Sequence, residues 1–389
     1  MIKIDYSRKI KQLPPYLFAE MDRLKQEGVK QGQRIISFGI GDPDLATPEP
    51  IIQALKKAAD APENHHYPSY EGLFLFRKEI SQWFIKRYGV SLDPETEILS
   101  LLGSKEGIGH LPFAFIDKND FVLVPDPGYT VYRSGTVFAG GTPYLMPLRK
   151  ENGFLPDLKA IPERIKKRAR LMFINYPNNP TAASAPRAFF EDVVKMAQRY
   201  HIIVAHDAAY NEMYFDNEKP FSFLEVKGAR DVGIEFHSFS KTFNMTGWRV
   251  GFAAGNADIL KGLGSIKNNL DSGVFQAVQY AAMEALRRYD ELSAPIRKVY
   301  GSRRDLVAAR MDELGWKYVK PKATFYFWVE TPAGYDSRKM TMRLLQEAGI
   351  MVTPGNGFGE NGEGFIRLAV TVNDDLINEA FDKIGSIRW

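Results

Sequence analysis

Short apolar segments alternate with longer amphipathic segments between about residues 50 and 265. Seven apolar segments have the length and the β-branched composition of strands. They span residues 98–102, 121–124, 143–146, 171–175, 202–206, 234–238 and 250–254. Amphipathic segments typical of helices lie between most of them, among them 74–88, 187–200 and 257–268. Apolar strands separated by helices predict an α/β fold with a mostly parallel seven-stranded sheet between helices.

The pattern changes after residue 274. Residues 274 to about 314 contain almost no glycine and predict one long helix. Strand-like segments follow at 317–319, 325–329 and 365–369, with a helical segment at 338–347. This mixture predicts a second, smaller α+β domain, which the long helix joins to the first.

A length of 389 residues exceeds what one hydrophobic core usually supports, so about two domains are expected. We predict a large domain over residues 46–280 and a small C-terminal domain over residues 281–389. Residues 1–45 are interrupted by prolines and predict an irregular N-terminal arm that includes part of the small domain. The arm is expected to pack on the small domain or on another subunit.

Composition and charge narrow the class of protein. The net charge of +4 is small and spread along the chain, which argues against a nucleic-acid partner. The chain has no cysteine and its six histidines show no metal-ligand spacing, so no metal site is expected. The first residues lack the apolar core of a signal peptide, and no segment is long enough to span a bilayer. We therefore expect a cytoplasmic protein without a membrane partner.

One motif points to a dinucleotide site and is set aside. Residues 357–362 fit the pattern G-x-G-x-x-G. A dinucleotide-binding segment follows a strand and opens a helix, whereas here a predicted strand comes after the motif. We interpret these residues as a loop.

Candidate chemistry lies at the strand ends, where ligands of open α/β sheets bind. Ser104 and Lys105 follow the first strand and open a helix, an arrangement that suits a phosphate. A ring, an amide and a carboxylate follow later strands, namely Tyr129, Asn179, and Asp207 with Tyr210 nearby. A carboxylate in that position is costly unless it meets a cation or a protonated ring.

The segment 238–252 carries the strongest chemical signal. Lys241 follows the apolar strand at 234–238, and burial there favours its neutral, nucleophilic amine. Ser238, Ser240 and Arg249 beside it form a natural phosphate site. Together with the other strand ends, this segment matches a planar, cationic, phosphorylated cofactor, pyridoxal 5'-phosphate (PLP).

These residues resemble the fold-type I PLP-dependent aminotransferases of class I/II over essentially the whole chain. The segment around Lys241 and Asn179-Pro180-Thr181 carry the resemblance most specifically. It implies three catalytic residues: Lys241, which bonds to the cofactor and moves the proton, Asp207 at the ring nitrogen, and Tyr129 on the ring face. Asn179 and Tyr210 are expected at the 3'-oxygen. Ser104, Lys105, Ser238, Ser240 and Arg249 are expected at the phosphate.

The same resemblance implies substrates and a partner. An amino acid and a 2-oxo acid would exchange the amino group by ping-pong kinetics. Substrate contacts are expected from Tyr16, Gly41, Lys105, Asn179 and Arg367, with Arg367 on the α-carboxylate. Tyr67 matches a tyrosine that reaches the phosphate of the neighbouring subunit, so a homodimer with a cross-subunit active site is expected.

Several segments are similar to one branch, the LL-diaminopimelate aminotransferases of lysine biosynthesis: 13–20, 103–112, 124–129, 173–180, 206–210 and 352–359. Two departures stand out. Ala182 replaces the usual glycine after Asn-Pro-Thr, and a local backbone change is expected there. Tyr70 stands where one branch has a glutamate that binds the distal ammonium, and the sequence leaves open whether Glu71 takes that role.

Other functions share these motifs. A broader aspartate, alanine or aromatic aminotransferase would use the same cofactor residues, and so would a PLP-dependent β-lyase that cleaves C–S bonds. A non-catalytic PLP sensor would carry an additional DNA-binding segment, and none is recognisable in the sequence.

Overall fold

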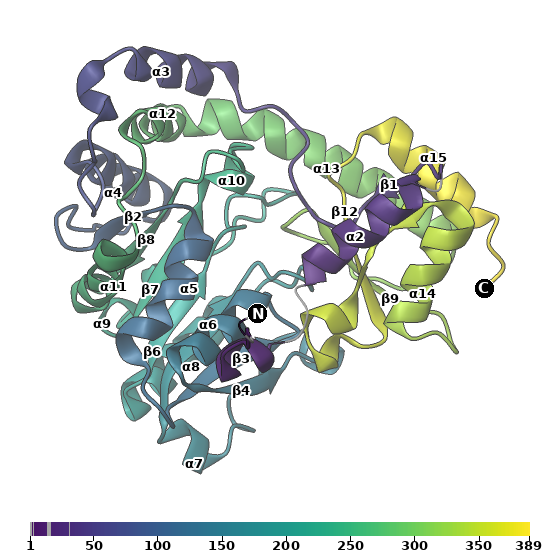
Figure 1. The fold of residues 1–389 in the computed structure, drawn as a ribbon, viewed down its shortest axis with the longest axis horizontal. Coiled ribbons are helices and arrows are strands. Elements are labelled where there is room, and N and C mark those ends of the chain that lie inside the picture. The colour runs from purple at the N-terminus through teal and green to yellow at the C-terminus, as the bar shows by residue number, and fades with distance from the viewer. Residues whose placement is uncertain (1, 3, 14–16, 31) are drawn as a thin grey trace.

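The computed structural model describes residues 2, 4–13, 17–30 and 32–389. It consists of a large and a small lobe, and the long helix α13 (Tyr289–Glu313) runs from one to the other (Figure 1). The large lobe contains the predicted sheet, and the small lobe contains most of the C-terminal part of the chain.

The central sheet has seven strands in the order β2-β8-β7-β6-β5-β3-β4. The strands are β2 (Ile98–Leu101), β3 (Phe121–Asp126), β4 (Thr142–Pro147), β5 (Ala169–Asn175), β6 (Ile203–Asp207), β7 (Gly233–Ser238) and β8 (Gly251–Gly255). Only β8 runs against its two neighbours; the other pairs are parallel. Because β3, β5, β6 and β7 are parallel, their carboxyl ends meet at one edge of the sheet.

Alternate strand residues pack against helices on opposite faces of this sheet. In β5, Leu171 and Phe173 pack with α5 (Ser104–Phe115), α6 (Thr130–Ala139) and α11 (Ala257–Leu270). Met172 and Ile174 pack on the other side with α4 (Phe74–Tyr88), α8 (Arg187–Tyr200) and α12 (Gln276–Arg287). Burial on both faces explains why the strands read as continuous apolar runs. The helix α3 (Glu49–Ala59) covers α12 from outside (Figure 1).

The small lobe has its own sheet and core. The strands β11 (Thr353–Pro354), β12 (Phe365–Ala369) and β9 (Tyr326–Glu330) pair antiparallel, and β1 (Ile36–Ser37) pairs parallel with β10 (Ile350–Met351). Phe38, Tyr300 and Phe381 belong to its buried cluster, together with side chains of α14 (Ser337–Arg343) and α15 (Asp374–Gly385). The division into residues 1–45, 46–280 and 281–389 stays a prediction. Helix α12 crosses its boundary at 280/281, because Ala281 and Leu286 still pack in the cluster of the large lobe.

Short elements complete the described chain. The short α-helices are α1 (Arg8–Lys11), α7 (Glu163–Lys166), α9 (Ala229–Val232) and α10 (Phe239–Thr242). Further helical turns are Pro62–His65, Lys150–Asn152, Phe223–Glu225, Leu344–Ala348, Gly355–Phe358 and Glu360–Gly362.

Two local predictions were wrong, and a third was confirmed with a change of helix type at its end. The helix expected over 274–314 is two helices, α12 and α13, because Arg288 between them has non-helical dihedrals (φ −106°, ψ 29°). Residues 317–319 form no strand: only Tyr318 pairs, in an isolated bridge with Val329. The helix expected at 338–347 begins as α14 and continues as a π-helical turn at Leu344–Ala348.

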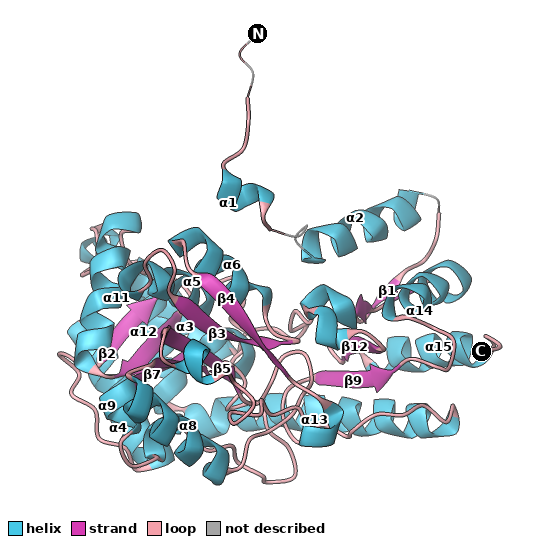
Figure 2. Cartoon of the chain, turned by 90° about the horizontal axis from the view of Figure 1, so that it is seen from below, coloured by secondary structure: helices cyan, strands magenta, loops and turns pink. Residues whose placement is uncertain are grey.

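The arm was also predicted too loosely, because it contains the 14-residue helix α2 (Leu17–Lys30). Within that segment there is no proline, and Met21 belongs to a buried cluster that includes Trp328, Met351 and Phe358. This contact with the small lobe stabilises the helix. Figure 2 shows α2 beside the small lobe, while the N-terminal end extends away from the body of the molecule.

Candidate active site

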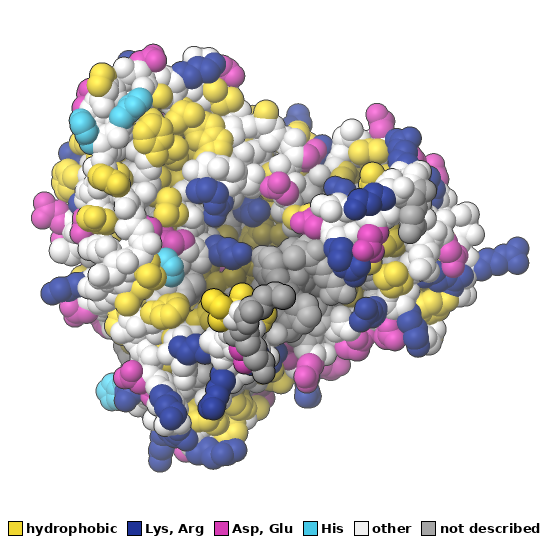
Figure 3. Space-filling model, in the orientation of Figure 1, with side chains coloured by type: hydrophobic (Ala, Val, Ile, Leu, Met, Phe, Trp, Pro, Cys, Tyr) yellow, Lys and Arg dark blue, Asp and Glu magenta, His cyan; other side chains and the backbone are white. Residues whose placement is uncertain are grey.

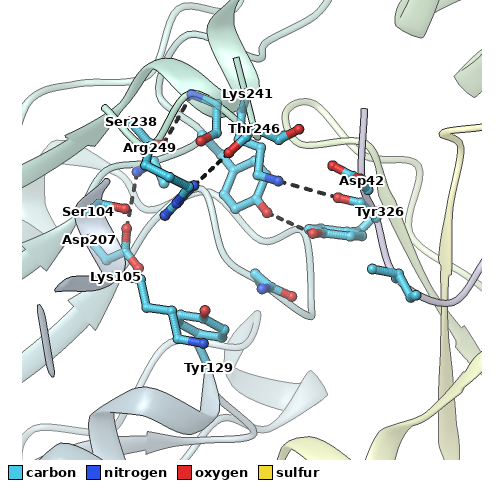
Figure 4. A pocket seen from close by; sticks show the side chains of 16 residues that line it. Asp42, Ser104, Lys105, Tyr129, Asp207, Ser238, Lys241, Thr246, Arg249 and Tyr326 are labelled. Atoms are coloured by element: carbon cyan, nitrogen blue, oxygen red, sulfur yellow. Dashed lines mark hydrogen bonds between the residues drawn. The ribbon is translucent and has the colours of Figure 1, made fainter. Parts of the chain in front are cut away.

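A cavity of about 310 Å³ lies at the carboxyl ends of the central strands, facing the small lobe. Figure 3 shows the surface hollowed between the two lobes. The lining residues are Ile40, Gly41, Asp42, Ser104, Lys105, Tyr129, Asn179, Asp207, Ala209, Tyr210, Ser238, Ser240, Lys241, Thr246, Arg249 and Tyr326. Figure 4 shows many of these side chains converging on the same space.

Most of the residues singled out from the sequence meet in this cavity. Eleven of them line it: Gly41, Ser104, Lys105, Tyr129, Asn179, Asp207, Tyr210, Ser238, Ser240, Lys241 and Arg249. Arg367 lies behind the cavity wall, and Tyr67 lies elsewhere, 87% exposed. Tyr16 falls outside the described residues.

Lys241 lies in α10, the single helical turn that follows β7 directly. Its Nζ is 3.4 Å from the carbonyl oxygen of Gly41. Burial lowers the pKa of Lys241 to about 8, helped by the positive charges of Arg367 and Arg249 and opposed by Asp42. The fold thus places an amine that is partly neutral near neutral pH.

Asp207 is the last residue of β6 and is buried. Its carboxylate accepts hydrogen bonds from the Tyr132 hydroxyl (2.7 Å) and the Ala209 backbone N–H (3.2 Å). Burial raises the pKa of Asp207, and these two hydrogen bonds oppose the rise. A buried carboxylate that lines a cavity suits a ligand with a positive charge. Tyr132 was not predicted as a partner of Asp207, from which it lies 75 residues away along the chain.

The residues expected at a phosphate lie together where α5, β7 and the segment before β8 meet, and we call this group the phosphate seat. Ser104 begins α5, and the Ser238 Oγ accepts a hydrogen bond from the Ser240 N–H (3.2 Å). The Arg249 guanidinium donates to the carbonyl oxygens of Thr246 (2.7 Å) and Leu102 (3.3 Å). These donors at a helix N-terminus are the chemistry that binds a phosphate.

Gly103 keeps this seat open. Its φ is +80°, and a Cβ there would lie 2.4 Å from Nη2 of Arg249. Any other residue at position 103 would therefore displace the guanidinium as well as strain the turn.

Arg367 is fully buried on β12 and reaches the cavity through its neighbours. Its Nη1 donates to the Asn179 side-chain oxygen (2.7 Å), and its Nη2 donates to the Gly39 carbonyl oxygen (2.6 Å). The guanidinium carbon lies 4.1 Å from the ring centre of Tyr326 and 4.7 Å from that of Phe358. Asn179 and Tyr326, which both line the cavity, therefore connect this arginine to it.

The turn that carries Asn179 is held by side chains of its own segment. The Asn179 N–H donates to the Asn175 side chain (2.8 Å), and the Asn178 side chain accepts from both the N–H and the hydroxyl of Thr181. Ala182 has a φ of +59°, the left-handed conformation that glycine adopts without steric cost. The alanine at this position thus occupies a glycine-like backbone geometry.

Tyr129 presents its ring to the cavity at the start of α6. The ring packs edge-to-face on Tyr132, with centroids 5.9 Å apart, and Tyr132 stacks on Phe173. Lys105 Nζ lies 6.0 Å from the Tyr129 ring centre. The ring is therefore held by packing from the sheet side.

Five lining residues were not predicted: Ile40, Asp42, Ala209, Thr246 and Tyr326. Ala209 and Thr246 lie beside predicted residues and carried no chemical signal of their own. Ile40, Asp42 and Tyr326 come from segments outside the large lobe's strand ends, so the strand-end rule did not reach them.

A cluster of possible metal ligands lies beside the phosphate seat. Glu106, His110 and Asp271 bring ligand atoms within 4.8 Å of one another. The buried Lys267 supplies a positive charge at this cluster, with its Nζ 2.7 Å from Asp271 and 3.7 Å from Glu106. The cluster therefore reads as an ion-pair network.

The loop over 357–362 lies across two short helical turns and leads into β12, as predicted, so it lacks the context of a dinucleotide site. Across the described parts of the chain, no helix is both long and apolar enough to cross a membrane.

Comparison with known proteins identifies the class. The sequence model of the family "Aminotransferase class I and II" matches residues 33–384. The chain belongs to this family and is a transaminase, and the expected fold class is confirmed.

Particular relatives are close over the full length. The chain is 51% identical to the LL-diaminopimelate aminotransferase of Aquifex aeolicus, with 99% of each chain covered. It is also 51% identical to the LL-diaminopimelate aminotransferase of Halothermothrix orenii, with 97% of each chain covered. The substrate-bound structure of BacF from Bacillus subtilis superposes with a TM-score of 0.95 at 39% identity, covering 99% of this chain and 98% of that one.

Proposed function

We propose that this transaminase uses PLP and transfers the amino group between LL-diaminopimelate and 2-oxoglutarate, with tetrahydrodipicolinate and glutamate as the other reactants. The proposal of PLP rests on one observation: the Lys241 amine, the buried Asp207 carboxylate and the phosphate seat all line the same cavity. The choice of substrate rests on the relatives that are about half identical over the whole chain.

The residues of the cavity fit PLP part by part. Arg249, Ser104, Ser238 and Ser240 would hold the phosphate, in the space that Gly103 leaves open. Asp207 would meet the protonated ring nitrogen, which removes the cost of burying an uncompensated carboxylate. Tyr129 would cover the ring face, and Asn179 with Tyr210 would reach the 3'-oxygen.

The bound cofactor supplies the sink for the negative charge that develops at the substrate Cα. Lys241 removes and returns the proton, for which a pKa near 8 is well suited because both protonation states are then accessible near neutral pH. Asp207 would face the protonated ring nitrogen, whose positive charge would favour the carboxylate form against the effect of burial. Arg367, which is hydrogen-bonded to Asn179, orients the α-carboxylate of the substrate.

We propose a homodimer for the working enzyme, in the cytoplasm. Tyr67 lies outside its own cavity, as expected of a residue that completes the site of a partner. Exposed apolar side chains accompany it in nearby segments: Tyr70, Phe74, Leu75, Leu270 and Phe275. Gly273 lies against Pro68 and Ser69, so these segments form one surface. Figure 3 shows a hydrophobic patch on this lobe, over α12.

Glu71 is the residue we propose for reading the distal ammonium of LL-diaminopimelate, from the partner's side. It is exposed, and its carboxylate accepts a hydrogen bond from the Ser69 hydroxyl (2.7 Å). This hydrogen bond has the largest effect in lowering the pKa of Glu71, and a backbone hydrogen bond at Glu71 lowers it further. Both favour the carboxylate anion, which can pair with an ammonium group. Tyr70 beside it is also exposed.

A panel of amino donors tests the proposal. LL-diaminopimelate, meso-diaminopimelate, aspartate, alanine and phenylalanine are assayed with 2-oxoglutarate in wild type and Glu71→Gln. We expect LL-diaminopimelate to give the highest kcat/KM. Glu71→Gln should lower kcat/KM about tenfold for donors with a distal ammonium group and leave it unchanged for aspartate, alanine and phenylalanine. A higher kcat/KM with aspartate, alanine or phenylalanine would instead favour the broader aminotransferase. A cysteine S-conjugate is assayed beside them without 2-oxoglutarate, and release of a thiol, a 2-oxo acid and ammonia from it would favour the C–S β-lyase.

A further inference from the structure

Tyr326 joins two residues that act on different ligands. It is the first residue of β9, and its hydroxyl lies 2.7 Å from the hydroxyl of Tyr210. The face of its ring lies 4.1 Å from the guanidinium carbon of Arg367. Tyr326 is 2% exposed and lines the cavity, so both contacts are shielded from bulk water.

The strand register fixes this arrangement. On β12, Arg367 lies opposite Trp328 of β9, so Tyr326 is its diagonal neighbour on the same face of the sheet. The Tyr326 N–H donates to the Thr324 hydroxyl (3.1 Å), which anchors the start of the strand.

Gly41 makes room for the ring. Its φ is +67°, and a Cβ there would lie 2.6 Å from the Tyr326 ring and 2.7 Å from its hydroxyl. Figure 4 shows Tyr326 beside Asp42 and opposite Lys241 at the edge of the cavity.

The two contacts have separate consequences. If the Tyr326 hydroxyl donates to Tyr210, the Tyr210 proton is directed away from Tyr326 and into the cavity. A hydroxyl that accepts one hydrogen bond is also a stronger donor of the next. The ring face, by contrast, attracts the Arg367 cation through its quadrupole, and this attraction is largest where water is excluded.

We propose that Tyr326 is a positioning residue: its hydroxyl orients the Tyr210 hydroxyl toward the 3'-oxygen of the cofactor, and its ring holds Arg367 for the substrate carboxylate. The inference rests on the proposed function, because Tyr210 and Arg367 have these ligands only there. It adds a residue of the small lobe to the control of both the cofactor and the substrate.

Spectroscopic titration tests the hydroxyl. The visible absorption of the PLP-loaded protein is followed against pH in wild type, Tyr326→Phe, Tyr210→Phe and the double variant. Each single variant weakens the hydrogen bond donated to the 3'-oxygen. The midpoint pH of the absorption change should therefore rise, and it should rise less in Tyr326→Phe than in Tyr210→Phe. In the Tyr210→Phe background, Tyr326→Phe should add no shift. An unchanged midpoint in Tyr326→Phe, or an equal shift in both backgrounds, overturns this half of the proposal.

Steady-state kinetics tests the ring. Tyr326→Phe keeps the ring face on Arg367, so the KM for an amino acid should stay within about twofold. Tyr326→Leu removes that face and should raise the KM about tenfold with a smaller change in kcat. Equal KM values for the phenylalanine and leucine variants overturn this half. Thermal unfolding checks that each variant folds, and Tyr326→Met replaces the leucine variant if it does not.

Failure of the proposed function would look different. In that case wild type would show no visible PLP absorption, or borohydride reduction would leave no label on Lys241. Failure of the inference alone leaves the wild-type spectrum and transamination intact while the Tyr326 variants behave as wild type.

Discussion

The amine of Lys241 lies close to the side chains that determine its protonation. Burial lowers its pKa to about 8, the charges of Arg367 and Arg249 add to this effect, and Asp42 opposes it. A lysine in water titrates near 10.4, so the folded chain holds far more neutral amine at pH 8 than an unfolded one.

Chemical labelling of the cofactor-free protein measures this shift. Only the neutral amine reacts with an acylating reagent, so the labelling rate of Lys241 should rise with pH, pass its midpoint near pH 8 and level off above it. The rate is followed by mass spectrometry of the Lys241 peptide, with peptides of exposed lysines as internal reference. Lys241→Arg, in which that peptide is not labelled, confirms the assignment. A rate that keeps rising through pH 10 would contradict the shift.

Among the elements, α11 supports the phosphate seat from behind. Lys267 on α11 is fully buried and pairs with Asp271 (2.7 Å) and Glu106 (3.7 Å). Glu106 in turn accepts a hydrogen bond from the Leu102 N–H (3.0 Å), while the Leu102 carbonyl accepts from Arg249. The turn before α5 is therefore tied both to the arginine of the phosphate seat and to the buried lysine.

Removing Lys267 should destabilise this region. In Lys267→Met, Glu106 and Asp271 keep their negative charges without the buried cation, and the free energy of unfolding should fall by about 3 kcal/mol. Urea denaturation of the cofactor-free protein measures the change. The matched control is Lys267→Met combined with Glu106→Gln and Asp271→Asn, which should recover part of the loss. A loss below about 1 kcal/mol would mean that the network behaves as a solvated surface pair.

The strands and helices that were predicted best are those buried by contacts within the large lobe. The seven strands of the large lobe lie within two residues of their predicted limits at every end, because both faces are covered and the apolar runs are continuous. Helix α2 was missed because the cluster that buries Met21 with Trp328 and Phe358 consists of residues distant along the chain, which the pattern of one segment does not show. The end of α12 was missed because Leu-Arg-Arg-Tyr at residues 286–289 contains no residue that usually stops a helix.

At the scale of the whole molecule, one residue proposed to contact the cofactor, Tyr67, lies outside the cavity of its own chain. Tyr67 is 87% exposed, and the nearby apolar side chains Leu75 and Phe275 are 52% and 44% exposed. A surface of this kind is typical of contact with another chain. Since most soluble oligomers are symmetric homo-oligomers, a second copy is the occupant we propose.

Mixing two inactive variants tests the shared site. We expect a mass of about twice 44.1 kDa for the protein in solution. Lys241→Ala and Tyr67→Ala are dissociated, mixed in equal amounts and reassociated. A mixed dimer then contains one site with both native residues, so activity should return to about a quarter of wild type.

The outcome of the mixing experiment distinguishes the two arrangements. If each chain used its own Tyr67, every site in the mixture would still lack one residue, and activity would not return. Mixing Lys241→Ala with Asp207→Asn provides the control. Because both residues line the cavity of the same chain, each site of the mixed dimer still lacks one of them, and activity should not return.

The sequence by itself determined the strands, the order in which their ends follow one another, and the residues that stand at those ends. These features are local, and the parallel arrangement of β3, β5, β6 and β7 then brings their ends to one edge. Only the tertiary structure decided the partners of these residues: Tyr132 on Asp207, Asn179 on Arg367, and Tyr326 between Tyr210 and Arg367. The three of these pairs that are joined by a hydrogen bond are separated by 75 to 188 residues along the chain. Such contacts depend on how the lobes and faces pack, which no periodicity along the chain records.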